Sequence, residues 1–162
     1  MLLKGSCHCE VVTFTVESHY IYPFNYCYCS ICRKTSGGGG YAINLSGDYN
    51  SLSISGAENL KIYHPKIKNT GTNQIETSPA EINFCSECGS SLWLYDSRWP
   101  NLVHPYASAI DSELPIAPER THLMLDYKAS WVSVDLESND NEFPEFPVES
   151  IAEWHERLKL TV

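Results

Sequence analysis

The sequence predicts a mainly β domain of antiparallel strands, followed by a short C-terminal helix. Along most of the chain, short runs of β-branched and aromatic residues alternate with clusters of Gly, Ser, Asn and Asp, a pattern typical of strands joined by tight turns. The length of 162 residues suits one hydrophobic core that needs no disulfide staples. We therefore expect one β domain over residues 1–146 and a tail over residues 147–162 that carries the helix.

The first predicted strand follows a pair of cysteines. Apolar and more polar side chains alternate over residues 11–16, so one face of this extended segment is apolar. In the extended chain just before it, Cys7 and Cys9 point to the same side and can offer both sulfur atoms to one ion. His8 then points to the other side, and we interpret it as a solvent-facing or hydrogen-bonded residue rather than a ligand.

Further strands are predicted through the middle and late parts of the chain, each bounded by turn residues. They are Tyr41–Leu45, Leu52–Ile54, Leu60–Tyr63, Glu81–Phe84, Ser91–Tyr95, Leu102–Ala107, Thr121–Leu125 and Ser130–Val134. Residues 18–25 are rich in aromatic side chains and contain a proline, so we expect a loop or an edge segment there. Trp93, Trp99 and Trp131 are expected to lie in the core or in the wall of a pocket.

The last part of the chain is predicted to form a solvated segment and then a short helix. Between Asp135 and Glu149 there are six acidic residues, two prolines and no Lys or Arg. Ser150 and Glu153 have the spacing of a capping box, which begins a helix. Its apolar stripe consists of Ile151, Trp154 and Leu158. We expect this helix to pack on the sheet, with contact to the second subunit of a homodimer as the alternative.

Seven cysteines fall into three groups with the spacings C-x-C, C-x-C-x-x-C and C-x-x-C. They are Cys7 and Cys9, then Cys27, Cys29 and Cys32, and finally Cys85 and Cys88. A disulfide framework would leave one thiol over, whereas zinc takes four thiolates in a closed structural site and three protein ligands in an open one. We therefore predict a closed zinc site from the two outer pairs and an open one from the triplet. Gly89 permits the turn beneath the closed site, which would connect the N-terminal strand to a late hairpin.

The triplet combines two local geometries. Cys27 and Cys29 share a side if the chain is extended, whereas Cys29-x-x-Cys32 is the spacing of a tight turn whose amides can point at sulfur. Three sulfur atoms can thus converge from one short segment. The alternatives are a redox disulfide between Cys29 and Cys32, or inert buried thiols. His104 and His122 are also considered for a site, but we interpret each as a hydrogen-bonded structural residue.

A basic and glycine-rich run follows the triplet. Arg33 and Lys34 are followed by two hydroxyl residues and then by four consecutive glycines over residues 37–40. Cationic side chains and the amides of a permissive backbone can together hold an anionic group. We therefore expect Arg33, Lys34, Ser36 and Gly37 to contact an anionic ligand. The alternative is a flexible turn that leads into the next strand.

The charge composition argues against some partners. The chain has 11 Lys and Arg against 20 Asp and Glu, so its formal net charge is −9 and it would repel a phosphate backbone. No apolar run approaches the roughly 18 to 20 residues that cross a bilayer, and the first residues contain no hydrophobic signal core. We expect a protein of the cytoplasm, and also of the nucleus, that binds neither nucleic acid nor a membrane.

The cysteines and their neighbours resemble the glutathione-dependent formaldehyde-activating enzyme family, which includes centromere protein V. The matching segments are Gly5–Cys9, Cys27–Gly37 and Phe84–Ser90, and more weakly His122 and Lys128–Trp131. The resemblance implies a fold of the β-tent kind with two zinc ions. It assigns Cys7, Cys9, Cys85 and Cys88 to a structural zinc, and Cys27, Cys29 and Cys32 to a catalytic zinc. The middle of the triplet is often histidine in this family, whereas it is Tyr28 here.

The activity that the resemblance implies is condensation of formaldehyde with glutathione to S-hydroxymethylglutathione, a carbon–sulfur lyase reaction. Zinc with three thiolates has a formal charge of −1, so it would acidify bound water weakly yet could accept a fourth thiolate. We expect glutathione, or a similar small thiol, at the open position, with Arg33 and Lys34 holding its carboxylates. Formaldehyde or another aldehyde would be the second substrate. The alternative is a non-catalytic, zinc-stabilised binding module that retains the family cysteines.

Overall fold

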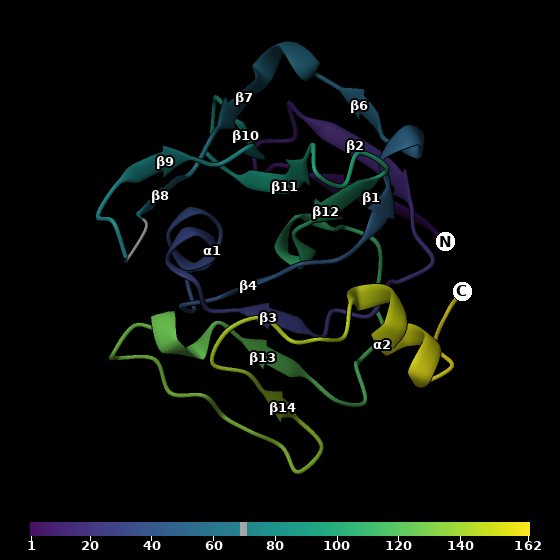
Figure 1. Cartoon of the computed structure of the whole chain (residues 1–162). Coiled ribbons are helices and arrows are strands. Elements are labelled where there is room, and N and C mark those ends of the chain that lie inside the picture. The colour runs from purple at the N-terminus through teal and green to yellow at the C-terminus, as the bar shows by residue number, and fades with distance from the viewer. Residues whose placement is uncertain (69–70) are drawn as a thin grey trace.

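The computed structural model describes residues 1–68 and 71–162, and it confirms the mainly β prediction. Figure 1 shows one group of strands in the upper part of the molecule and a second sheet below it. Helix α1 (Ser30–Thr35) lies between these parts on one side, and helix α2 (Ile151–Arg157) lies on the other. No helix within the described ranges has both the length and the apolar character that crossing a bilayer requires.

Most strands of the described residues are short. They are β1 (Leu2–Ser6), β2 (Thr13–Glu17), β3 (Asn25–Cys27), β4 (Ala42–Ile43), β5 (Gly47–Asp48), β6 (Ser53–Ser55), β7 (Leu60–Tyr63), β8 (Lys66–Lys68), β9 (Ile75–Thr77), β10 (Ala80–Cys85), β11 (Ser91–Asp96), β12 (Leu102–Pro105), β13 (Thr121–Leu123) and β14 (Asn141–Glu142). Four 3-10 turns, η1 (Tyr49–Ser51), η2 (Ala57–Asn59), η3 (Ala107–Ala109) and η4 (Leu125–Tyr127), lie between them.

The described strands form four sheets. Their orders are β1-β2-β6, β5-β12-β11-β10-β7, β14-β13-β3-β4 and the two-stranded β8-β9. Pairing is antiparallel as predicted, except that β13 is parallel to both β3 and β14. In this parallel pairing Leu123 lies opposite Cys27, so the late strand β13 borders the start of the cysteine triplet.

The main core confirms the alternation predicted for residues 11–16. Val12, Phe14 and Val16 are buried, and the ring of Phe14 lies edge-on to Trp93 with the ring centroids 5.0 Å apart. Gly5 is required opposite Phe14, because an added Cβ would lie 2.4 Å from the Ala109 carbonyl oxygen. The close approach of β1 to the segment around η3 therefore depends on the absence of a side chain at this position.

Several expectations about the later chain are wrong. Residues 130–134 do not form a strand, and Trp131 is 68% exposed, because this segment follows η4 as an irregular loop on the surface. Trp99 is 52% exposed at the turn after β11, where Arg98 covers one face of its ring, so it is not a core residue. Asp140 belongs to the segment predicted to be solvated, yet its side chain is 1% exposed because it pairs with Arg120.

Helix α2 begins at the predicted capping box. The Ser150 hydroxyl accepts a hydrogen bond from the Glu153 N–H at 3.2 Å, and the Glu153 carboxylate accepts one from the Ser150 N–H at 2.8 Å. The helix packs on the aromatic loop before β3 instead of on a sheet. Trp154 stacks on Phe24 with ring centroids 3.7 Å apart, and Trp154 and His155 are the two buried residues of the helix.

The contact between α2 and this loop predicts a loss of stability in acid. His155 is fully buried, its Nδ1 lies 2.8 Å from the Ile151 carbonyl oxygen, and its Nε2 accepts a hydrogen bond from the Tyr22 N–H at 3.1 Å. Burial lowers the pKa of His155 below the unfolded value of about 6.5, so the unfolded chain binds the proton more readily. The stabilising neutral form is fully present above pH 6.5, and its contribution is lost as the pH falls towards the folded pKa.

Urea denaturation at pH 7.5 and 5.5 measures this effect. Wild type should lose up to about 1.4 kcal/mol per pH unit more than His155→Gln, which cannot titrate. The same pH dependence in both proteins would contradict the assignment of this buried histidine as neutral.

Candidate metal centres

The two outer cysteine pairs come together as predicted. The sulfur atoms of Cys7, Cys9, Cys85 and Cys88 all lie within 4.8 Å of one another. The Cys7 and Cys9 sulfurs are 3.5 Å apart, and those of Cys9 and Cys85 are 3.8 Å apart. These separations match the edge of about 3.8 Å expected for four sulfurs at tetrahedral Zn–S distances of about 2.3 Å. We call this group the closed cluster, and its donor set and spacing fit a tetrahedral metal ion.

The backbone around the closed cluster shapes it for a metal. Cys85 ends β10, and the Gly89 N–H donates to the Cys85 carbonyl oxygen at 2.9 Å with Gly89 at φ +74°, as expected for the turn beneath an ion. The Cys7 sulfur accepts a hydrogen bond from the Val12 N–H at 3.4 Å. The Ser90 hydroxyl, 3.2 Å from the Cys88 sulfur, lowers the pKa of this thiol to about 5. Ionisation of this thiol favours metal binding, because the thiolate is the ligand.

The central triplet also converges. The sulfurs of Cys27, Cys29 and Cys32 lie within 4.8 Å of one another, and Cys29 is the member that is not buried. Cys27 ends β3, and Cys29 is the N-cap of α1, where its sulfur accepts a hydrogen bond from the Cys32 N–H at 3.3 Å. The predicted tight turn with amides aimed at sulfur is therefore the first turn of a helix that the sequence pattern did not reveal.

The three thiols of the triplet shift one another's pKa values. Hydrogen bonds from the thiols of Cys27 and Cys32 lower the pKa of Cys29 to about 3. The same interaction with Cys29 raises the pKa of Cys27 to about 12. Cys29 is thus the member that ionises most readily, while the neighbouring thiols keep their protons. A metal ion can replace those protons, and three soft sulfur donors with no carboxylate suit zinc better than magnesium or calcium.

A buried polar chain lies beside the triplet. The Tyr28 hydroxyl is 2.9 Å from Nδ1 of His122, and Nε2 of His122 is 3.4 Å from the Asp140 carboxylate. Burial alone would raise the pKa of Asp140, but hydrogen bonds from Arg120 lower it to about 2. The prediction that His122 is a hydrogen-bonded structural residue is confirmed. His104 has the same kind of role, with its Nδ1 3.0 Å from the Leu45 carbonyl oxygen.

The residues expected to contact an anion line a pocket of about 690 Å³. It is lined by Ser6, Cys7, His8, Glu10, Arg33, Lys34, Thr35, Ser36, Gly37, Gly38, Gly89, Ser90, Ser91, Ser108, Ala109 and Asp111. Arg33, Lys34, Ser36 and Gly37 are therefore brought together. Their pocket borders the closed cluster through Cys7, whereas the triplet cysteines are not among its lining residues.

Two features of the pocket point to an anionic ligand. The Nε atom of Arg33 is buried and has no hydrogen-bond partner in the described parts of the chain. Gly37 brings its backbone to the pocket wall in a place where a side chain would not fit, because an added Cβ would lie 1.9 Å from the Tyr41 carbonyl oxygen. An unpaired buried guanidinium nitrogen suits a carboxylate, and Gly37 presents only backbone at the pocket wall.

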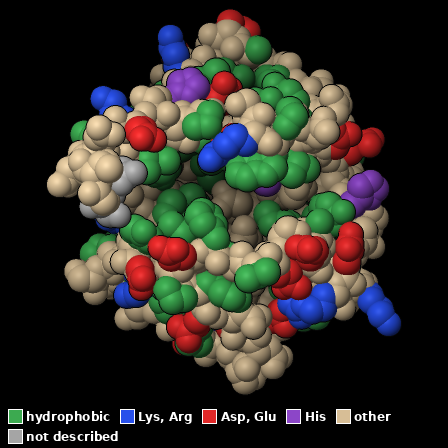
Figure 2. All heavy atoms as spheres, viewed as in Figure 1, with side chains coloured by type: hydrophobic (Ala, Val, Ile, Leu, Met, Phe, Trp, Pro, Cys, Tyr) green, Lys and Arg blue, Asp and Glu red, His purple; other side chains and the backbone are tan. Residues whose placement is uncertain are grey.

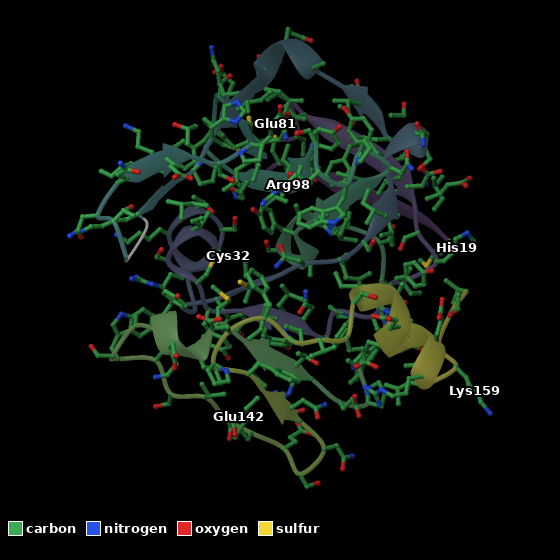
Figure 3. The ribbon with its side chains drawn as sticks, viewed as in Figure 1. His19, Cys32, Glu81, Arg98, Glu142 and Lys159 are labelled. Atoms are coloured by element: carbon green, nitrogen blue, oxygen red, sulfur yellow. The ribbon has the colours of Figure 1, made fainter. Side chains whose placement is uncertain are left out.

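A separate hollow opens on the face seen in Figure 2, where hydrophobic side chains frame it. In the same view, Cys32 lies beside it on the α1 side and Arg98 lies above it (Figure 3). Arg98 is held by Asp96 through hydrogen bonds of 2.6 to 3.1 Å. The molecule thus offers two approaches to the region of α1, one through the pocket and one through this hollow.

The chain is thus a small β domain with one four-cysteine and one three-cysteine cluster, each of which could hold a metal ion. The model of the glutathione-dependent formaldehyde-activating enzyme family matches residues 2–126. A protein of Halomonas elongata, provisionally named a glutathione-dependent formaldehyde-activating enzyme, is 59% identical over 160 residues, which is 99% of this chain and 98% of that one. The chain therefore belongs to the glutathione-dependent formaldehyde-activating enzyme family.

A solved structure agrees with this fold. A crystal structure of a Rhodobacter sphaeroides protein from a structural genomics programme superimposes with a TM-score of 0.51 and 28% sequence identity. The match covers 69% of this chain and 91% of that one. The β architecture described above is thus shared with an experimentally determined protein.

The two clusters predict opposite results for single serine substitutions. Cys85→Ser should unfold the domain, because it removes the ligand that connects β10 to the cysteines after β1. Cys29→Ser should keep the fold and lose one metal ion per chain, because the triplet comes from one short segment. Circular dichroism and elemental analysis of the purified variants measure both outcomes. Unfolding of Cys29→Ser with Cys85→Ser still folded would reverse the roles of the clusters.

Proposed function

We propose that the protein is a zinc-dependent carbon–sulfur lyase that joins a small thiol, with glutathione as the leading substrate, to formaldehyde or a similar aldehyde. The observation that carries the proposal is the triplet of Cys27, Cys29 and Cys32, with three converging sulfurs of which one is not buried. The closed cluster would hold a structural zinc through all four of its cysteines. Family membership and the name of the Halomonas elongata relative support the same reaction.

A zinc ion held by the triplet would supply an open coordination position that favours thiolate over thiol. The half-buried Cys29 marks the accessible side of this site. Cys27 and Cys32 are buried, so they would exclude water from the rest of the metal's surroundings. The three cysteines thereby fix where the substrate sulfur must approach.

The pocket would hold the charged groups of the thiol. Arg33 and Lys34, together with Ser36 and the amide of Gly37, present donors for its carboxylates. Glu10 and Asp111 line the same pocket and supply the opposite charge. A peptide thiol such as glutathione carries both carboxylates and an ammonium group. A pocket with cationic and anionic parts would therefore orient it better than it would a simple acid or amine.

The reaction itself requires positioning more than acid–base power. The S–H bond of the thiol breaks, a C–S bond forms to the aldehyde carbon, and the proton ends on the aldehyde oxygen. No electron transfer takes place. Holding the two reactants together supplies most of the rate enhancement that such a condensation needs. A thiol of this kind is abundant in reducing compartments, so the proposal implies the cytoplasm.

One observation favours a second candidate function. The triplet cysteines do not line the pocket that holds Arg33 and Lys34. A non-catalytic binding module would retain the closed cluster for folding and use the pocket for a small ligand or a peptide end. It would bind its ligand equally well after the triplet is changed.

Exchange NMR at equilibrium separates these candidates. With glutathione and formaldehyde, zinc-loaded wild type should accelerate exchange between free and S-hydroxymethyl glutathione beyond the spontaneous rate, and Cys29→Ser should not. The reason is that the triplet supplies the position for the substrate thiolate. Glutathione binding by both proteins without any acceleration would favour the binding module.

A pair of cation substitutions tests which approach the thiol uses. Lys34→Met should raise KM for glutathione about tenfold with little change in kcat, because it removes a charge-assisted contact made equally before and during reaction. Arg98→Met is the matched control at the rim of the separate hollow, and KM should stay near the wild-type value. A raised KM in Arg98→Met, with an unchanged KM in Lys34→Met, would instead indicate that the thiol binds in the hollow.

A further inference from the structure

Tyr106 places a hydroxyl group in the interior beside the triplet. It follows β12, and its N–H donates to the Leu92 carbonyl oxygen at 3.0 Å, which fixes the backbone. The side chain is fully buried and belongs to the same hydrophobic cluster as Cys27 and Cys32. Tyr106 therefore joins this cluster from the end of β12, a segment remote in sequence from β3 and α1.

The hydroxyl of Tyr106 is unpaired. No hydrogen-bond partner for it is found in residues 1–68 and 71–162. The hydroxyls of Ser36 and Thr35 lie nearby, but neither has the geometry of a hydrogen bond to it. Thr35 already donates to the Ile31 carbonyl oxygen at 2.8 Å. Leaving a buried hydroxyl group unpaired destabilises the folded state, so an unpaired buried hydroxyl in a native protein commonly has a functional role.

The sulfurs of the triplet differ in the hydrogen bonds that they accept. The sulfur of Cys29 accepts a hydrogen bond from the Cys32 N–H. For the sulfur of Cys32, the described residues provide no hydrogen-bond donor of this kind. The buried ring of Tyr106 packs in the same cluster as Cys32, so its hydroxyl group can reach this cysteine only within the protein interior. A phenol hydroxyl without a hydrogen-bond partner and a cysteine sulfur that accepts no backbone hydrogen bond thus belong to one buried cluster.

We propose that the Tyr106 hydroxyl donates a hydrogen bond to the Cys32 thiolate when a metal ion is bound at the triplet. Tyr106 is then a positioning residue of this centre. It fixes the orientation of one ligand and offsets part of the excess negative charge of three thiolates around one divalent ion. The proposal rests on the proposed metal site at the triplet, and it assigns the outer contact of that site to a residue that the cysteine pattern does not indicate.

Tyr106→Phe tests the proposal because it removes only the hydroxyl and keeps the ring. With the closed cluster filled by zinc and cobalt(II) titrated into the triplet, the variant should bind cobalt about tenfold more weakly than wild type. Its sulfur-to-cobalt charge-transfer band should move to lower energy, because the thiolate loses a stabilising donor. Without metal at the triplet, the variant should have a denaturation midpoint equal to or above that of wild type, because an unpaired buried group has been removed.

Two controls make the test specific. Tyr95→Phe removes the hydroxyl of a partly buried tyrosine in β11 and should change neither the cobalt affinity nor the spectrum. In a Cys32→Ser background, Tyr106→Phe should no longer weaken cobalt binding. Equal cobalt affinity and an unchanged band in Tyr106→Phe would overturn the inference while leaving the metal site in place. Failure of wild type to bind cobalt at the triplet would overturn both, and a lower midpoint for the metal-free variant would show that the hydroxyl has a structural partner.

Discussion

The closed cluster is the constraint on which the rest of the structure depends. Cys9 and Cys85 are separated by 76 positions in the sequence, yet their sulfurs are 3.8 Å apart. The strands that meet there belong to different sheets, β1 to a three-stranded sheet and β10 to a five-stranded one. Most strands in this chain are too short to hold distant segments together by their own hydrogen bonds. A metal ion shared by four thiolates would offset the entropy of closing so long a loop.

The triplet depends on this frame and on two further contacts made far along the chain. Strand β13 pairs in parallel with β3 and places His122 beside Tyr28, while the buried Asp140 and Arg120 complete the polar chain. Tyr106, which follows β12, contributes a fully buried ring to the cluster that contains Cys27 and Cys32. The sulfurs are thus presented by a local segment, whereas their surroundings are built by residues about 75 to 115 positions later.

What could be predicted from the sequence was mostly local, and the meeting of the two outer cysteine pairs is the exception. The cysteine spacings, the alternation over residues 11–16 and the capping box of α2 each report contacts between near neighbours, and the structure confirms them. The parallel pairing of β13, the burial of Asp140 and the contact of His122 with Tyr28 could not be predicted, because they join segments remote in sequence. Helix α1 was missed because its six residues are too few for a helical period to appear. The pocket residues were expected beside the triplet, but spacing along the chain does not tell on which side of α1 they face.

Two clusters of the same chemical type would have different roles. The closed cluster would hold two sheets together, and the triplet would bind a substrate thiol. Zinc-edge anomalous diffraction from crystals of the wild-type protein tests this division most directly. It should show two peaks in each chain, one surrounded by the sulfurs of Cys7, Cys9, Cys85 and Cys88, the other bound by the triplet and by one ligand from outside the chain. A single peak at the closed cluster, with a disulfide joining Cys29 and Cys32, would contradict it.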